Sequence, residues 1–209
     1  MVAQRTMESN DRRIRRVRRA ELPEGTVELA RFLVGKTIVR ELPHGRLSGR
    51  IVETEAYLPG DAACHAFRGP TPRNRSLFLR HGHAYVYFVY GSHFMLNVSS
   101  EEAGTGAGIL LRAMEPLEGV ESMQRRRGTA RLLDLARGPG RLAAALRIGK
   151  RLDGLDLSAS HELWLGTAVR AVGPIGVSVR IGVTKDADRQ LRFYERGNAF
   201  VSGPKRLRT

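Results

Sequence analysis

The segment from His83 to Ser100 constrains the fold more than any other part of this chain. Two apolar, strand-like runs are broken there at Gly91-Ser92, a pattern that predicts a β-hairpin with Tyr90 at or next to its tip. Solvated turns favour Gly, Asn and Asp, so a tyrosine at the tip predicts a ring that enters something flat and stacked. Four of the chain's five tyrosines lie in this segment or before it: Tyr57, Tyr85, Tyr87 and Tyr90.

The net charge indicates which partner such a ring would meet. The 209 residues include 35 Lys and Arg against 21 Asp and Glu, a net charge of +14. A field of this sign attracts polyphosphate and predicts salt-dependent binding through counterion release. An acidic membrane surface is the alternative, but the sequence contains no basic amphipathic helix with aromatic anchors. Nucleic acid is therefore the favoured partner.

The cysteine content and the hydropathy pattern exclude several kinds of site. Cys64 is the only cysteine, which excludes an intrachain disulfide, a Cys-rich zinc site and a four-cysteine iron–sulfur cluster. No apolar run approaches the ~20 residues of a membrane span, and no apolar signal region begins the chain. We expect a soluble intracellular protein without metal or cofactor. It would be cytoplasmic and associated with the nucleoid in a bacterium, or nuclear in a eukaryote.

The succession of apolar segments predicts one α+β domain, built on a curved, mainly antiparallel β-sheet with flanking helices. No repeat, linker or alternating βαβ rhythm divides the chain. Helical spacing occurs over residues 26–34, 118–126 and 140–148. Strands are expected over residues 37–42, 46–57, 108–114, 162–165, 177–183 and 191–196, besides the two strands of the hairpin.

The N-terminal segment has a different composition. Residues 1–20 contain seven Arg and two acidic residues, with almost no periodic apolar positions. This composition predicts a flexible basic arm, with order beginning near Glu24 and residues 21–209 forming the single domain. A solvated tail and an arm with non-specific DNA affinity fit the composition equally well.

Two other patterns indicate no function. The run from Val34 to Thr37 resembles the end of a phosphate-binding loop, but that motif requires glycine where the chain has Ala30. His81 and His83 could form a metal pair, yet no third ligand is near them in sequence. A surface turn is the favoured interpretation of this pair.

The strand expected to end at Tyr57 contains candidate chemistry. Residues two apart on a strand share a face, so Glu53, Glu55 and Tyr57 point the same way. Two carboxylates and a ring that precede a loop could form an active-site wall. The polar outer face of an exposed strand explains the pattern as well. A carboxylate pair of a glycoside hydrolase is a further alternative, although such pairs lie in acidic clefts and this chain is basic.

A set of short motifs follows a fixed order along residues 20 to 203. They are Arg50-Ile-Val-Glu-Thr-Glu-Ala-Tyr-Leu-Pro59, His65, Thr71-Pro-Arg-Asn-Arg75, Tyr85-Val-Tyr-Phe-Val-Tyr-Gly91, Asn97-Val-Ser-Ser100, Leu110-Leu-Arg-Ala-Met-Glu-Pro-Leu-Glu-Gly119, Gly138-Pro-Gly-Arg-Leu142, Arg180-Ile-Gly-Val183 and Leu191-Arg-Phe-Tyr-Glu-Arg-Gly197. Each motif is weak alone, but the ordered set closely resembles the alkyladenine (3-methyladenine or methylpurine) DNA glycosylase family.

The resemblance implies a base excision repair enzyme that flips an alkylated or deaminated purine out of double-stranded DNA. The enzyme hydrolyses the N-glycosidic bond of that base and leaves an abasic site. Tyr90 matches the family's intercalating residue, which makes the hairpin a protruding, DNA-inserting one. Arg73, Arg75 and Arg141 are expected to contact the DNA backbone, and we expect a monomer.

The resemblance also implies a pocket for the flipped base. Tyr57 would lie on one face of the base, and His65 and Tyr87 on the other. Alkylated purines are electron-deficient and positively charged, so they should stack well on such rings. Asn97 matches the residue that crowds the exocyclic amine of guanine and so discriminates against a normal base. A buried, hydrogen-bonded loop histidine is the alternative interpretation of His65.

Within this pocket, Glu55 matches the catalytic residue. As a general base it would accept a proton from the water that attacks the anomeric carbon. Arg112 matches the partner that helps to position this water, together with a backbone carbonyl expected to be that of Ile181. Arg112 could equally form an ion pair that supports the sheet. Glu53 is expected to be structural.

The lysines bear on whether the enzyme also cuts the strand. A lyase needs an amine that forms a Schiff base, and the chain's lysines lie outside the pocket motifs: Lys36, Lys150, Lys185 and Lys205. The sequence therefore predicts a water nucleophile and a monofunctional enzyme.

Three questions stay open. Ser92 and His93 follow the expected wedge where the family often has a bulky apolar residue, so the wedge could be less supported. The order of preference among 3-methyladenine, 7-methylguanine, hypoxanthine and ethenoadenine is not determined. A non-catalytic nucleic-acid-binding protein, with the tyrosines as stacking platforms, is the alternative function.

Overall fold

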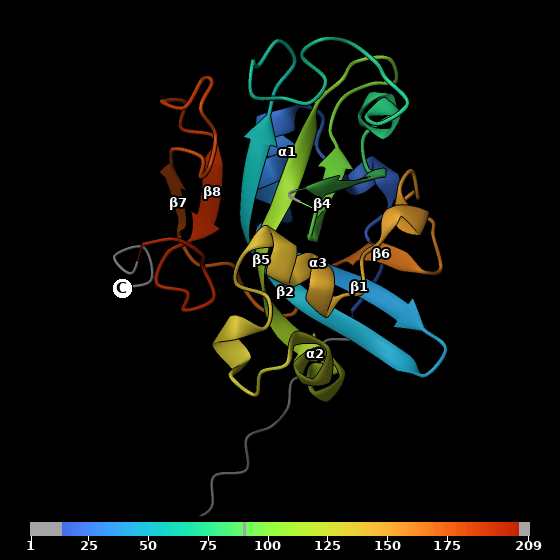
Figure 1. Cartoon of the computed structure of the whole chain (residues 1–209), viewed down its shortest axis with the longest axis vertical. Helices are drawn as coiled ribbons and strands as arrows, with labels where there is room; N and C mark the ends of the chain where they lie inside the picture. Colours follow the sequence, from blue (N-terminus) through green and yellow to red (C-terminus); the bar gives the residue numbers. More distant parts are fainter. Residues whose placement is uncertain (1–13, 90, 205–209) are drawn as a thin grey trace, which may run out of the picture.

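An antiparallel sheet that curls around one hydrophobic core organises the computed structural model, which describes residues 14–89 and 91–204 (Figure 1). The strands are β1 (Thr37–Leu42), β2 (Gly45–Tyr57), β3 (Ala84–Val89), β4 (His93–Ser99), β5 (Gly108–Glu118), β6 (Leu163–Gly166), β7 (Ile175–Ser178) and β8 (Arg192–Glu195). Their order is β3-β4-β5-β2-β1-β6, and β8 pairs with both β2 and β7. The predicted α+β architecture is confirmed.

In the described part of the chain, three α-helices accompany the sheet: α1 (Thr26–Leu33), α2 (Val120–Arg127) and α3 (Pro139–Ala145). Pro139 begins α3 because its fixed φ suits the first helical position, where its missing N–H has no partner to lose. Gly128 ends α2 in the left-handed conformation, with φ of 62°, which a residue without Cβ adopts freely. The 3-10 helices span Arg19–Glu21, Arg75–Phe78, Leu132–Asp134 and Lys150–Leu152.

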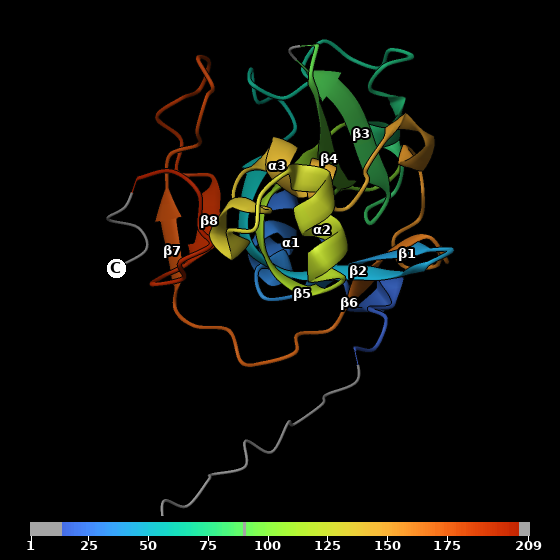
Figure 2. The ribbon, with the colours of Figure 1, turned by 60° about the horizontal axis from the view of Figure 1, so that its bottom comes forward.

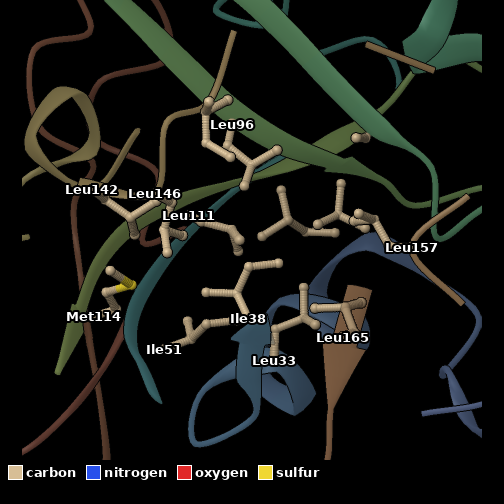
Figure 3. Packing of buried hydrophobic residues seen from close by; sticks show 14 of the residues in the cluster. Leu33, Ile38, Ile51, Leu96, Leu111, Met114, Leu142, Leu146, Leu157 and Leu165 are labelled. Carbon is tan, nitrogen blue, oxygen red and sulfur yellow. The ribbon is translucent and has the colours of Figure 1, made fainter. Parts of the chain in front are cut away.

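The core lies inside the curl of the sheet. Leu33 of α1, Leu142 of α3 and Ile38, Leu111 and Met114 of the sheet are fully buried and belong to one cluster (Figure 3). Figure 2 shows α2 and α3 side by side, and α3 also contacts β4 and β5. Truncation of one fully buried leucine to alanine typically lowers the free energy of unfolding by ~2–5 kcal/mol. This cluster therefore fixes the scaffold on which the site is built.

β2 is the strand that connects the core to the site. It pairs with β1 along its first half, with β5 along most of its length, and with β8 at Glu53–Glu55. Its register against β5 shifts on both sides of Glu53. Such irregularities bend a strand and re-aim its side chains, and they are common next to active sites.

Several boundaries differ from the sequence predictions by a few residues, and two of the differences change how a segment is described. The strand expected over residues 177–183 is wrong in its second half, because β7 ends at Ser178 and the chain continues as a loop. Order also begins before Glu24: Val17 is 2% exposed and donates its N–H to the carbonyl of Leu165 in β6. The flexible arm expected over residues 1–20 therefore does not include residues 14–20, and residues 1–13 lie outside the described residues.

The turn before β3 contains the two histidines considered as a metal pair. His81 is 4% exposed, so it is buried and the expectation of a surface turn is wrong for this residue. No group of three His, Cys, Asp or Glu side chains that could hold a metal occurs among residues 14–89 and 91–204. No helix in the described part of the chain is both long enough and apolar enough to cross a membrane.

Candidate active site

The predicted hairpin is present. β3 and β4 pair in antiparallel register from Ala84↔Val98 to Val89↔His93. Tyr90 lies outside the described residues, so its insertion into DNA stays a prediction. Beside it, the Ser92 hydroxyl and His93 Nδ1 are hydrogen-bonded at 2.5 Å. These two residues thus bond to each other at the positions where the family often has a bulky apolar residue.

A cavity of about 420 Å³ is partly lined by this hairpin, a volume within the usual range of small-molecule sites. It is bounded by side chains from β2 to β5, from the loop after β2 and from the loop after β7. Six residues predicted for the site line it: Tyr57, His65, Tyr87, Asn97, Arg112 and Ile181. The fold therefore brings together residues that are up to 124 positions apart in sequence.

Glu55 lies directly behind the wall of this cavity. Its side chain is fully buried. Oε2 accepts a hydrogen bond of 2.9 Å from the Tyr57 hydroxyl and lies 3.1 Å from Nη1 of Arg112, while Oε1 accepts one of 2.7 Å from the N–H of Ile181. All three partners line the cavity. A carboxylate has about four lone-pair sites, so capacity for a further donor remains.

Arg112 connects Glu55 to a second buried carboxylate. Its Nε donates to Oε1 of Glu53 at 2.9 Å, so one guanidinium contacts both acids. Glu53 also accepts hydrogen bonds from Arg192 Nε at 2.6 Å and from the backbone N–H of Ser202 at 2.7 Å. Burial opposes ionisation of Glu53, but Arg112 and Arg192 outweigh it and hold its pKa below the usual range. Glu53 thus anchors Arg112, in agreement with the structural role expected for it.

Aromatic rings form another wall. The ring centres of His65 and Tyr87 lie 4.4 Å apart with their planes at 67°, and Tyr85 stacks on Tyr87 at 5.3 Å. His65 Nδ1 and the Tyr85 hydroxyl are hydrogen-bonded at 2.9 Å. His65 is exposed, but desolvation by its neighbours lowers its pKa, and Arg73 lowers it further. The imidazole is therefore neutral at neutral pH.

Tyr85 is a cavity residue that the sequence reasoning did not assign to the site. It is 1% exposed, yet it lines the cavity and carries the hydrogen bond that holds His65. The signal was present, because residues two apart on a strand share a face and Tyr85 precedes Tyr87 by two.

Lys185 lies outside the pocket motifs of the sequence, but it lines the cavity. The reason is the loop after β7, which folds along the cavity and brings Ile181 and Lys185 to the same wall. Lys185 follows the Arg180–Val183 motif by two residues, so its place near the cavity could have been predicted from the sequence.

The remaining predicted residues have mixed positions. Arg73, Arg75 and Arg141 are exposed, as contacts to a DNA backbone require, and that role stays a prediction. Nη2 of Arg73 donates to the carbonyl of Phe88 in the hairpin at 3.3 Å, and Nη1 of Arg141 lies 3.4 Å from Oδ1 of Asp134. Ile181 reaches Glu55 with its N–H, whereas the expected contact of its carbonyl with a water is untested.

Comparison with known proteins decides the family of this chain. A family model described as "Methylpurine-DNA glycosylase (MPG)" matches residues 20–199. The chain belongs to the methylpurine-DNA glycosylase family. A relative from Mesorhizobium japonicum is 64% identical over 191 residues, which cover 91% of this chain and 92% of the relative. A relative from Paraburkholderia phytofirmans is 54% identical over 189 residues, which cover 90% and 89%.

Both relatives have the printed name "Putative 3-methyladenine DNA glycosylase". The matched residues include the whole wall described above, from β2 to the loop after β7. Family membership and these names support a DNA glycosylase that acts in DNA repair, with DNA as the substrate. The resemblance found in the sequence motifs is thereby confirmed.

Proposed function

We propose that this chain is a monofunctional DNA glycosylase whose cavity receives a damaged purine rotated out of a duplex. Glu55 then activates the water that hydrolyses the N-glycosidic bond. The observation that supports this proposal best is the position of Glu55, a fully buried carboxylate whose three polar partners all line the cavity. A polar outer face of an exposed strand would leave such a carboxylate in solvent.

The proposed step follows from this geometry. A water oxygen bonds to the anomeric carbon while the bond from that carbon to the purine nitrogen breaks, and the electron pair leaves with the base. Glu55 accepts the proton of the water and stabilises the positive charge that develops on the sugar. Arg112 and the Ile181 N–H hold the carboxylate in place.

The aromatic wall supports a purine as the ligand. A flat, electron-poor base stacks on Tyr57, Tyr87 and His65, and a cationic alkylated base gains from the faces of these rings. Tyr90 fills the vacancy in the duplex, which costs least where damage has weakened the base pair. The enzyme acts on double-stranded DNA as a monomer.

A lyase step is the second candidate, because Lys185 lines the cavity. Its amine would attack the aldehyde carbon of the abasic sugar, lose water and form an imine that borohydride reduces to a stable adduct. We favour the water mechanism, since Glu55 is held by three partners at the cavity wall. Borohydride trapping on wild type and Lys185→Ala decides between them. An adduct that forms with wild type and is lost in Lys185→Ala would overturn the monofunctional assignment.

The test of the function itself is base release. Duplexes with a single 3-methyladenine, 7-methylguanine, hypoxanthine or ethenoadenine are incubated with the protein and then treated with alkali to cleave abasic sites. We expect strand cleavage after alkali for at least one lesion, and none for the matched undamaged duplex. Binding to every duplex without release of any base would instead favour the non-catalytic alternative.

A further inference from the structure

Arg180 lies where the two loops that wall the cavity meet. Its side chain is fully buried. Nη1 donates to Oδ2 of Asp61 and to the carbonyl of Ala56, the latter at 3.0 Å. Nη2 donates to Oδ1 of Asp61 and to the carbonyl of Asp186, each at 3.1 Å. One guanidinium therefore fastens the end of β2 and the turn after it to the loop after β7.

A second contact joins the same two loops. The N–H of Ala62 donates to Oδ2 of Asp186 at 2.8 Å. The segments next to these contacts line the cavity: residues 63–65, directly after Ala62, and residues 181–185, between Arg180 and Asp186. The separation of these two walls thus depends on the junction at Arg180.

Arg180 also touches two of the three partners of Glu55. Its guanidinium carbon lies 4.6 Å from the centre of the Tyr57 ring, whose hydroxyl donates to Glu55. Ile181, the next residue in the chain, donates its N–H to the other oxygen of Glu55. A shift of Arg180 would therefore move both donors relative to the carboxylate.

We propose that Arg180 is a positioning residue of the glycosylase reaction, which acts on Glu55 through Tyr57 and the Ile181 N–H. This inference rests on the proposed function. Misplacement of a reacting group by ~1 Å can cost about 10²-fold in rate, so a distant contact that fixes two donors is relevant to catalysis. The planar guanidinium matches the Asp61 carboxylate with two parallel hydrogen bonds, which a lysine ammonium cannot reproduce.

The alternative is a buried ion pair that only stabilises the fold. Arg50 offers a matched control, because it forms a bidentate pair with Glu195, is equally buried and does not line the cavity. Arg180→Lys and Arg50→Lys both keep a positive charge and lose the planar fork. Asp61→Asn serves as a second variant on the other side of the junction.

The experiment measures single-turnover base release and the Kd for a duplex with a stable abasic-site analogue, at a temperature where each variant is folded. We expect Arg180→Lys and Asp61→Asn to lower the release rate by about 10–100-fold, with Kd changed by less than ~3-fold. Arg50→Lys should leave the rate of the folded enzyme within ~3-fold of wild type. The double variant Arg180→Lys/Tyr57→Phe should lower the release rate by less than the product of the two single-variant reductions, because both residues act on the same carboxylate.

A rate unchanged in Arg180→Lys, or losses that multiply fully in the double variant, would reduce Arg180 to a structural ion pair and overturn the inference. Wild type that releases no base from any lesion duplex would instead overturn the proposed function, and the positioning role with it. The two failures are distinguished by the activity of the wild-type protein.

Discussion

The hydroxyl of Tyr57 donates a hydrogen bond of 2.9 Å to Oε2 of Glu55, so the ring that walls the cavity also touches the carboxylate behind it. Burial, followed by the nearby Glu55, raises the pKa of Tyr57 above its usual range, which keeps the phenol protonated as a donor. The sequence predicted only a stacking platform at this position. The structure adds the hydrogen bond to Glu55, so the proposed stacking and this hydrogen bond can be tested separately.

Tyr57→Phe separates stacking from the hydrogen bond. The variant keeps the ring but loses the donor to Glu55, and one hydrogen bond to a charged group is worth ~1.5–3 kcal/mol. We therefore expect single-turnover base release to fall by about 10–100-fold while lesion binding is retained. Tyr57→Ala, the control, should lose binding as well. Equal rates for wild type and Tyr57→Phe would show that the hydroxyl has no part in the reaction.

The lowered pKa of His65 predicts a pH dependence of binding. Because desolvation by its neighbours and Arg73 hold this pKa below the usual ~6.5, the neutral ring persists to lower pH than a free histidine would allow. A charged imidazolium would repel a cationic alkylated base. Affinity for a 7-methylguanine duplex should therefore weaken at a lower pH than titration of a free histidine, near ~6.5, would produce. In His65→Gln this loss of affinity at low pH should be absent. An affinity of the wild-type protein that already falls above pH 7 would refute the prediction.

Asn97 predicts a change in selectivity. It is buried, lines the cavity and donates from Nδ2 to the carbonyl of Tyr85 at 3.3 Å, which fixes the side chain. A shorter side chain in Asn97→Ser leaves room for the exocyclic amine of guanine. We expect release of undamaged guanine, relative to 3-methyladenine, to rise by about 10–100-fold, as is usual for one steric contact in a pocket. An unchanged ratio would assign the discrimination to other residues.

The pair of Arg50 and Glu195 predicts the acid stability of the fold. The two guanidinium–carboxylate distances are 2.5 and 2.7 Å, and the Glu195 side chain is 8% exposed. Although burial opposes it, hydrogen bonding to Arg50 lowers the pKa of Glu195 from 4.5 to about 2. A carboxyl group whose pKa is lower in the folded state stabilises the fold at pH values above its pKa in the unfolded state. This contribution of roughly 3 kcal/mol is lost as the pH falls from about 4.5 to 2.

Glu195→Gln tests this contribution. The variant leaves Arg50 buried beside a neutral amide, and loss of one partner of a buried ion pair typically lowers the free energy of unfolding by ~3–5 kcal/mol. Urea unfolding at pH 7 should show that loss, and the difference from wild type should narrow as the pH approaches 2. A variant as stable as wild type at pH 7 would contradict the assignment.

Much of the fold could be predicted because its signals are local. The bounds of β1 agree with the prediction, and the hairpin follows from two apolar runs and the glycine between them. The six cavity residues named from the motifs also come together. They were named from the resemblance of the ordered motifs to a known glycosylase family, so the motifs, and not spacing within one strand, gave this part of the site.

The loop after β7 shows why other features could not be predicted. The alternation Val177-Ser-Val-Arg-Ile-Gly-Val183 predicts a strand with its apolar side chains inside. In the structure Val179 and Ile181 are 47% and 37% exposed, whereas Arg180 between them is buried against Asp61. Arg180 is held inside by Asp61, 119 residues away, and by the carbonyls of Ala56 and Asp186. A single sequence does not record such a pairing.

The N-terminal boundary has a similar cause. Arginine-rich composition predicts solvated chain, yet Val17 pairs with Leu165 of β6 and is buried there. Residues 14–20 contain four arginines, and their three apolar residues, Ile14, Val17 and Ala20, are too few to establish a periodicity. The order of this segment is therefore a tertiary effect.

The central claim is that one carboxylate behind the cavity drives hydrolysis, and Glu55→Gln tests it most directly. The amide keeps the size of the side chain but cannot accept the proton of the water, and general-base catalysis contributes typically 10²–10⁴-fold. Single-turnover release of the preferred base should fall by at least about 100-fold, while the Kd for the lesion duplex stays within ~3-fold of wild type. Release within ~3-fold of the wild-type rate by a folded Glu55→Gln protein would contradict the account.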